Sequence, residues 1–157
     1  MNTPSALREN IAALLDSDHA HQSFDSAMAE VPVAARGERP AGAPHSPWEL
    51  LEHMRIAQWD ILEYARGDAT HVSPDFPSGY WPPSPQPPNE TAWDESVAKF
   101  RADLAALVAI ANDDAFDLLA KIPRGNATWL AKILLVADHN TYHLGQLVLV
   151  RRMLTGK

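Results

Sequence analysis

The sequence predicts an all-α fold: a four-helix bundle with a long proline-rich crossover between its second and third helices. Three observations favour this fold. Apolar residues recur at helical spacing in four segments, no segment has the pattern of a strong β-strand, and most of the 13 prolines lie between those segments. At 157 residues the chain is expected to form one domain, residues 1–157.

The first helix is expected from about Pro4 to Glu30, with Thr3 as its N-cap and Pro4 at the first helical position. The polar stretch DSDHAHQ weakens the apolar face in its middle. The segment VPVAARGERPAGAPH then ends the helix, because it holds three prolines and two glycines. The second helix has the clearest start, since Ser46 and Glu49 form a capping box around a proline at the first helical position. It should end near Gly67.

The connection SPDFPSGYWPPSPQPPNE holds seven prolines, a density that excludes a helix or a central strand. A disordered linker is one interpretation. The aromatic residues Phe76, Tyr80 and Trp81 favour another, because such side chains are costly to leave in water. We expect an ordered crossover in a polyproline-like conformation, packed over one end of the bundle.

The third helix is expected from Asn89 or Thr91 to about Asn112, and the fourth from near Thr128 to about Leu154. The fourth helix is apolar nearly all round. Its face opposite the histidines described below carries Ile133, Leu134, Ala137, Leu144 and Val148. This second apolar stripe needs cover from other helices or from another subunit, so we expect a homodimer through the fourth helix, with Gly145 permitting close approach.

Composition narrows the classes of function. With a net charge of −7 and scattered basic residues, the sequence indicates no basic surface for binding nucleic acid or an anionic membrane. The chain has no cysteine, so any metal ion must be held by His, Asp or Glu. It shows neither a signal-peptide pattern nor 18 consecutive apolar residues, and we expect a soluble, cytoplasmic protein.

His139 and His143 lie four residues apart in VADHNTYHLGQLVLVRR. At about 100° per residue, His143 lies about 40° from His139, and Gln146 about 20° to the other side. Six apolar residues fall within about 80° of the same direction, so both imidazoles are expected to face the core; they are Leu135, Val136, Leu147, Val150, Met153 and Leu154. Such a pair can bind one ion, but two hydrogen-bonded core histidines would explain it equally well.

A third ligand would decide between these interpretations. His53 lies centrally on the second helix, on a face that it shares with Asp60 and Tyr64, and it can face the fourth helix in a bundle. His21 falls on the side of the first helix that could approach this site, although a surface position is the simpler expectation. The remaining histidines are His19 on the first helix and His45 and His71 in connections.

Two helices, HSPWELLEHMRIAQWDILEYA and LLVADHNTYHLGQLVLVRRML, together with the crossover PSGYWPP, resemble the DinB-like superfamily, named for a damage-inducible helical protein. The resemblance covers most of the chain. It implies a divalent metal ion held by His53, His139 and His143, where some relatives use a carboxylate at one position. Three neutral imidazoles suit zinc, nickel or iron(II), and leave coordination positions open for water or substrate.

Other residues of the expected site have less certain roles. Asp60 and Gln146 are candidates for orienting the imidazoles or the substrate, and His21 for lining the substrate pocket. For Asp60, a buried salt bridge is an equally good explanation. No general acid or base can be assigned.

The resemblance also implies a reaction. Characterised relatives include transferases and isomerases that use low-molecular-weight thiols such as bacillithiol or mycothiol, and relatives commonly dimerise. A thiol-dependent transfer to an electrophilic small molecule is therefore expected, with a metal-water hydrolase as the variant. The alternatives are a non-catalytic metal-binding stress protein and a protein whose histidines bind no metal.

Overall fold

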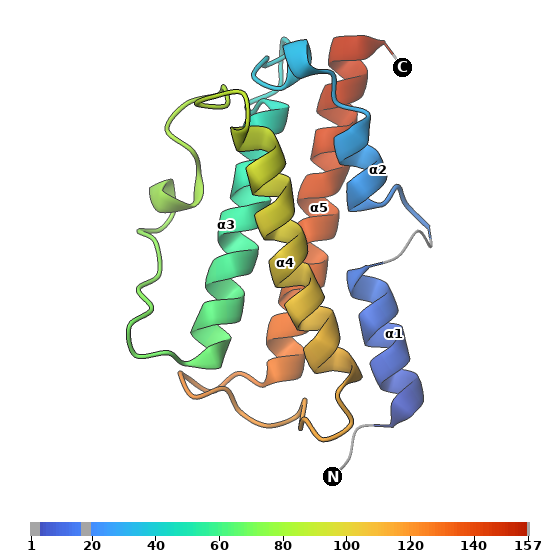
Figure 1. The fold of residues 1–157 in the computed structure, drawn as a ribbon, viewed down its shortest axis with the longest axis vertical. Helices are drawn as coiled ribbons and strands as arrows, with labels where there is room; N and C mark the ends of the chain where they lie inside the picture. The colour runs from blue at the N-terminus through green and yellow to red at the C-terminus, as the bar shows by residue number, and fades with distance from the viewer. Residues whose placement is uncertain (1–3, 17–19, 157) are drawn as a thin grey trace.

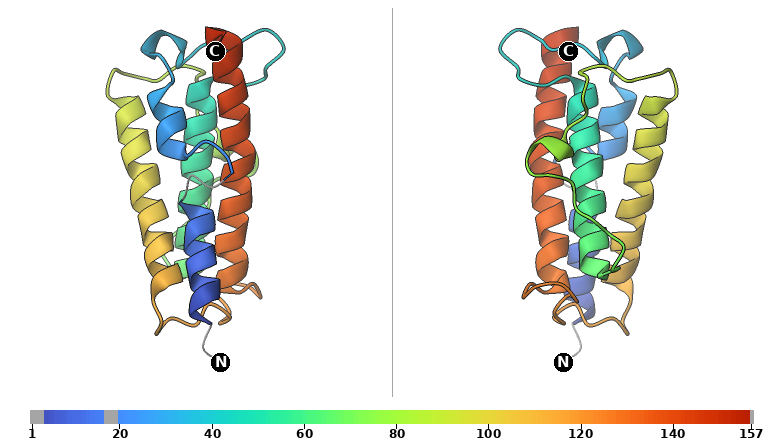
Figure 2. Two further views of the ribbon diagram at one scale, coloured as in Figure 1. Left: turned by 90° about the vertical axis from the view of Figure 1, so that its right-hand side faces the viewer. Right: turned by 90° about the vertical axis from the view of Figure 1, so that its left-hand side faces the viewer.

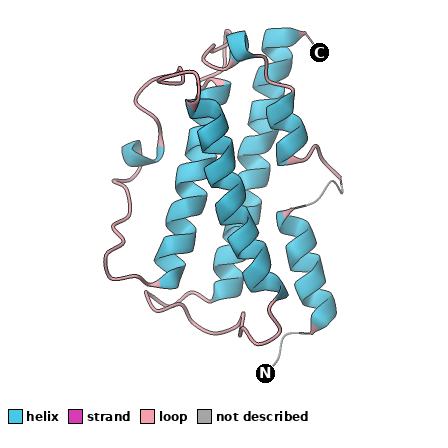
Figure 3. Ribbon diagram, viewed as in Figure 1, coloured by secondary structure: helices cyan, strands magenta, loops and turns pink. Residues whose placement is uncertain are grey.

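The computed structural model describes residues 4–16 and 20–156. These residues form five α-helices: α1 (Ser5–Leu15), α2 (Phe24–Ala29), α3 (Pro47–Arg66), α4 (Ala92–Asn112) and α5 (Trp129–Thr155). Two short 3-10 helices, η1 (Val33–Ala35) and η2 (Ser78–Tyr80), lie in connections. No strand occurs in this part of the chain, apart from an isolated bridge between Lys121 and Thr128. The predicted all-α fold is confirmed (Figure 3).

The long helices α3 and α4 start at the same end of the molecule and run in the same direction, whereas α5 runs in the opposite direction beside α3 (Figure 1). Helix α3 packs against both α4 and α5, and α1 packs against α4 and α5. Two consecutive parallel helices require the chain to return over a full helix length, about 30 Å for 20 residues. The long connection between α3 and α4 supplies this return.

The crossover therefore runs along the side of the bundle, in front of α3 and α5 (Figure 2, right). The expectation that it would cover one end of the bundle is wrong. Tyr80 and Trp81 are partly buried against the helices, whereas Phe76 remains 88% exposed. The crossover is ordered by these contacts and by hydrogen bonds, and only some of its aromatic residues take part.

The N-terminal part of the chain forms two helices, not the single helix expected from Pro4 to Glu30. Helix α1 ends at Leu15, and α2 begins after Ser23, whose hydroxyl accepts a hydrogen bond from the Ser26 amide. The described residues between the two helices, 16 and 20–23, are mostly polar, so a helix there would bury little apolar surface. Pro4 takes the N-cap position of α1, and Thr3 lies outside the described residues.

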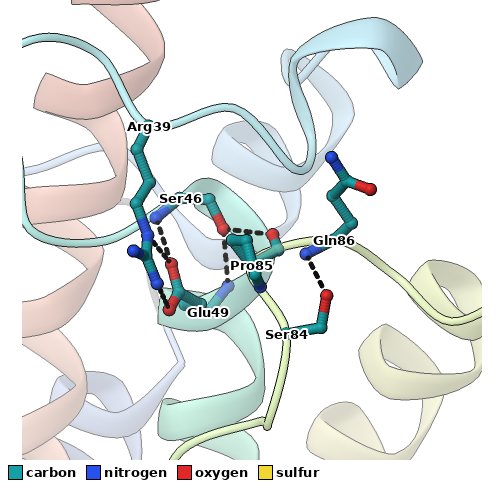
Figure 4. Close-up of polar contacts among 6 residues, drawn as sticks. All are labelled: Arg39, Ser46, Glu49, Ser84, Pro85 and Gln86. Atoms are coloured by element: carbon teal, nitrogen blue, oxygen red, sulfur yellow. Dashed lines mark hydrogen bonds and ion pairs between the residues drawn. The ribbon is translucent and has the colours of Figure 1, made fainter.

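The start of α3 is a complete capping box, as predicted. The Ser46 hydroxyl accepts from the Glu49 amide at 3.2 Å, and the Glu49 carboxylate accepts from the Ser46 amide at 2.8 Å. Arg39 forms an ion pair with the same carboxylate, and the Ser46 hydroxyl donates to the carbonyl of Pro85 in the crossover (Figure 4). The capping box thus also ties the preceding loop and the crossover to α3. The helix ends at Arg66 and is capped by Gly67, which has the positive φ of 76° that glycine favours.

The core lies between α3, α4, α5 and the N-terminal helices α1 and α2. Its largest fully buried apolar side chains are Phe100, Leu50, Leu51, Met54, Leu62, Leu107, Leu118, Ile133 and Leu147. Burial of each such side chain contributes about 1.5–3 kcal/mol. None of the described helices combines the length and apolar content that a membrane span requires.

Helix α5 is rotated relative to the expectation. Leu135 and Met153, expected to face the core, are 45% and 48% exposed, whereas Ile133 and Ala137, expected on the opposite stripe, are buried. The reason is that α5 packs against α3 on one side and against α1 and α2 on the other. His139 and His143 therefore lie at one margin of the buried arc, facing the crossover.

Candidate metal site

His53 of α3 meets His139 and His143 of α5. The Nε2 atom of His53 lies 3.1 Å from that of His143 and 3.2 Å from that of His139. The three possible ligand atoms all lie within 4.8 Å of one another. Zinc binds imidazole nitrogen at about 2.0–2.1 Å, which places two neighbouring ligand nitrogens about 3.0–3.4 Å apart. The observed spacing fits a single divalent ion.

Two of the three rings have a hydrogen-bond acceptor at their other nitrogen. His53 Nδ1 donates to the backbone carbonyl of Tyr80 at 2.9 Å, and His143 Nδ1 donates to the Gln146 side-chain oxygen at 2.8 Å. A neutral imidazole that donates from Nδ1 carries a lone pair on Nε2. These lone pairs converge, and a cation between them would relieve their repulsion. Gln146, expected near the site, orients His143 in the way typical of metal-binding histidines.

The third ring, His139, adjoins a buried polar network that the sequence did not indicate. Its Nδ1 and the Asn140 side-chain oxygen are both buried, and neither has a hydrogen-bond partner among the described residues. The Asn140 amide donates to the Gln58 side chain at 2.8 Å, and Gln58 donates to the Phe100 carbonyl at 2.8 Å. The network links α3, α4 and α5 behind the site. Gln58 is a glutamine at a fully buried position of a helix, which indicates a buried polar network. The sequence alone does not reveal that this position is buried.

Trp81 of the crossover covers the site. Its ring stacks on His53 with the centroids 3.9 Å apart and the planes 2° from parallel. His45 stacks on the same indole at 3.9 Å and 15°, so the two imidazoles enclose Trp81. These contacts leave His53 only 9% exposed. Sequence reasoning placed His45 in a connection without a role, because no periodicity relates a loop residue to a helix.

The environment keeps the three imidazoles neutral. Burial lowers the pKa of His53 to about 4, although its hydrogen bond to Tyr80 acts in the opposite direction. Burial, assisted by the neighbouring His143, lowers the pKa of His139 to about 4, and burial also lowers the pKa of His143. Neutral imidazole is the form that binds a metal ion. At neutral pH the three imidazoles are therefore in the form that is able to bind a metal ion.

Asp60 does not contact any of the three imidazoles. Its carboxylate accepts hydrogen bonds from His71 Nε2 at 2.8 Å and from the Tyr80 hydroxyl at 2.6 Å. Burial alone would raise the pKa of Asp60, but hydrogen bonds from Ser73, Tyr80 and His71 outweigh it and lower the pKa. Asp60 is thus an ionised carboxylate that contacts the crossover.

His21 lies away from the three histidines. It is exposed and lines a cavity of about 820 Å³ at the break between α1 and α2. None of the three clustered histidines lines this cavity, whose apolar wall includes Leu14, Phe24, Met54, Phe100, Leu104, Leu144 and Val148. His19 lies outside the described residues. The structure therefore does not bring His21 to the candidate metal site.

Comparison with curated proteins and with solved structures gives no significant match. The sequence model of the DinB superfamily matches residues 17–147. The matched segment contains the three clustered histidines, the crossover and the hydrogen-bond partners Tyr80 and Gln146. Because the match spans most of the chain and the described residues are all-helical, the protein belongs to the DinB superfamily.

Proposed function

We propose that this protein is a divalent-metal-dependent enzyme that transfers a low-molecular-weight thiol to an electrophilic small molecule. The observation that carries the proposal is the convergence of three Nε2 atoms, from His53, His139 and His143, at a spacing that fits one ion. Zinc, nickel and iron(II) all suit such a donor set.

The number of ligands supports catalysis over a purely structural role. A structural zinc site normally has four protein ligands, whereas a catalytic site has three and keeps a position open. Within the described residues, the group able to hold an ion contains three histidines and no carboxylate. An ion at this site would supply Lewis acidity, which lowers the pKa of a bound thiol or water molecule. Trp81 would limit the access of water to the His53 side of the site.

The test begins with elemental analysis of protein purified without an affinity tag. Metal-free and reloaded protein are then assayed with small thiols and with epoxide, haloarene and activated-alkene electrophiles, by following thiol consumption. We expect metal-dependent turnover that His143→Ala abolishes and that His21→Ala, a histidine substitution away from the site, retains. Absence of metal-dependent turnover with every pair would contradict the thiol-transfer proposal.

The same assay separates the alternatives. A metal-water hydrolase would hydrolyse activated esters with metal and without any thiol. A non-catalytic role also has a specific observation in its favour, because the ligands come from two helices and an ion would join α3 to α5. In that case metal removal would lower the unfolding temperature strongly, and no substrate would turn over.

We also propose that the protein forms a homodimer through α5. The outward face of this helix exposes five large apolar side chains: Leu134, Leu135, Tyr142, Leu149 and Met153. Gly145 lies on the same face, and a Cβ atom added there would have no neighbour within 4 Å, so a second helix could approach closely. Apolar residues grouped in this way mark interaction surfaces more often than isolated ones do.

The dimer makes a direct prediction. We expect a dimer by light scattering at micromolar concentration, and a monomer for Leu149→Glu, because a charge buried at the centre of the interface would lack a partner. Val72→Glu replaces another exposed apolar residue, 81% accessible and located in the crossover, and should remain dimeric. A monomeric wild-type protein would rule out this assembly.

A further inference from the structure

Asp60 is a buried residue that connects α3 to the crossover. It lies two helical turns beyond His53 and is 7% exposed. One carboxylate oxygen accepts from His71 and the other from the Tyr80 hydroxyl, and both partners belong to the connection between α3 and α4. Burial of a carboxylate is costly, and these hydrogen bonds offset the cost. Asp60 thus anchors the connection at His71 and Tyr80, in addition to the hydrogen bond from Ser73.

Tyr80 extends this anchor to the candidate metal site. Its hydroxyl reaches Asp60, and its backbone carbonyl accepts the hydrogen bond from His53 Nδ1 at 2.9 Å. The next residue, Trp81, stacks on the face of the same imidazole. Two consecutive crossover residues therefore hold the His53 ring: Tyr80 binds its Nδ1 edge, and Trp81 covers one of its faces.

The other contacts around Tyr80 are between rings: Tyr80 packs edge-to-face on Phe76, and the neighbouring Trp81 stacks on His53. Phe76 is exposed to solvent, and the residues that follow Trp81 are prolines, which have no amide hydrogen to donate. The strongest polar contact of Tyr80 with a helix is the charge-assisted hydrogen bond to Asp60. The Tyr80 carbonyl is therefore linked to α3 through a carboxylate that does not itself touch His53, beside the stacking of Trp81.

We propose that Asp60 is a positioning residue of the metal site, which acts through Tyr80 to hold His53 in the Nδ1–H tautomer with Nε2 directed at the ion. The inference rests on the proposed metal-binding function. Asp60 contacts neither the ion nor a substrate. A partner that fixes the tautomer of a metal-binding histidine contributes about 10- to 100-fold to metal affinity, and Asp60 supports such a partner.

The test uses Tyr80→Phe, which removes the hydroxyl and keeps the backbone carbonyl and the ring. Zinc affinity, measured by calorimetry on metal-free protein, is expected to fall about 10-fold. Ring-nitrogen NMR of the metal-free protein should show His53 protonated at Nδ1 in the wild type and a mixture of tautomers in Tyr80→Phe. Asp60→Asn keeps an oxygen that can accept from Tyr80, so it should lose less affinity than Asp60→Ala.

Two controls separate positioning from general loosening of the crossover. His71→Gln alters the contact at the other carboxylate oxygen and should leave zinc affinity and the His53 tautomer unchanged. Asp60→Ala with Tyr80→Phe should lose no more affinity than Asp60→Ala alone, because both act through one hydrogen bond. Thermal unfolding shows that each variant is folded.

An unchanged His53 tautomer in Tyr80→Phe would overturn the inference, and so would an equal loss of affinity in His71→Gln. The tautomer is measured on metal-free protein, so this measurement tests the positioning role of Asp60 independently of the proposed metal-dependent function. If the wild type bound no metal while Tyr80→Phe changed the tautomer, the positioning role would stand and the metal-dependent function would fail.

Discussion

Replacement of His143 by alanine is expected to abolish binding of the divalent ion. The substitution leaves two of the three converging imidazoles, and two ligands from different helices no longer define a site. Loss of an outer hydrogen-bond partner alone costs about 10- to 100-fold in metal affinity, so loss of a ligand should cost at least about 100-fold. Titration of metal-free protein with zinc chloride in a calorimeter measures the effect.

Two further variants serve as comparisons for the loss of metal affinity in His143→Ala. Gln146→Ala removes only the acceptor at His143 Nδ1 and should weaken binding by an intermediate amount, whereas His21→Ala should bind as the wild type does. Zinc should also raise the unfolding temperature of the wild type and not of His143→Ala, because a ligand that binds only the folded state stabilises it. Wild-type affinity in His143→Ala would show that the cluster is not the metal site.

Acidification is expected to destabilise the metal-free protein between about pH 6.5 and pH 4. Burial lowers the pKa of His53 and of His139 to about 4, whereas an unfolded histidine titrates near 6.5. Within this window the unfolded chain binds protons that the folded protein does not, so the free energy of unfolding falls as the pH falls. Below about pH 4 both states are protonated at these rings, and their contribution stops changing.

The two rings together are expected to lower the free energy of unfolding by an amount on the order of 3 kcal/mol, after allowance for the solvent that reaches His139. Urea unfolding at pH 7.0, 6.0, 5.0 and 4.5 measures it. Protonation of carboxylates with a lowered pKa, such as Glu49 and Asp60, also lowers the free energy of unfolding in acid, so a control is needed. The variant with His53→Asn and His139→Asn should show a clearly smaller change over this range. An equal change in that variant would assign the pH dependence to other groups.

The three long helices could be predicted because their signals are local. Ser46 and Glu49 start α3, Gly67 ends it, and Thr128 caps α5 through its hydroxyl. The four-residue spacing of His139 and His143 is local as well, since helical geometry alone places both rings on one side. His53 required one further assumption, that α3 and α5 are neighbours in a bundle.

The interruption of the first helix shows where local signals fail. The sequence predicts one helix that continues through the polar stretch after Leu15, whereas in the structure a new helix starts at Phe24. The competing signal, Ser23 as an N-cap, is as local as the apolar pattern. Tertiary packing decides between them, because a helical turn with no apolar side chain gains nothing from the core.

The sequence by itself therefore determined the helix class, most helix boundaries and the residues able to form a histidine triad. Only the tertiary structure decided the rotation of α5, the path of the crossover and the contacts made by Asp60, Tyr80 and Trp81. Tyr80 meets its hydrogen-bond partners Asp60 and His53 across 20 and 27 residues of sequence. No helical or strand periodicity relates a proline-rich segment to a helix, so contacts of this kind exist only once the chain has packed.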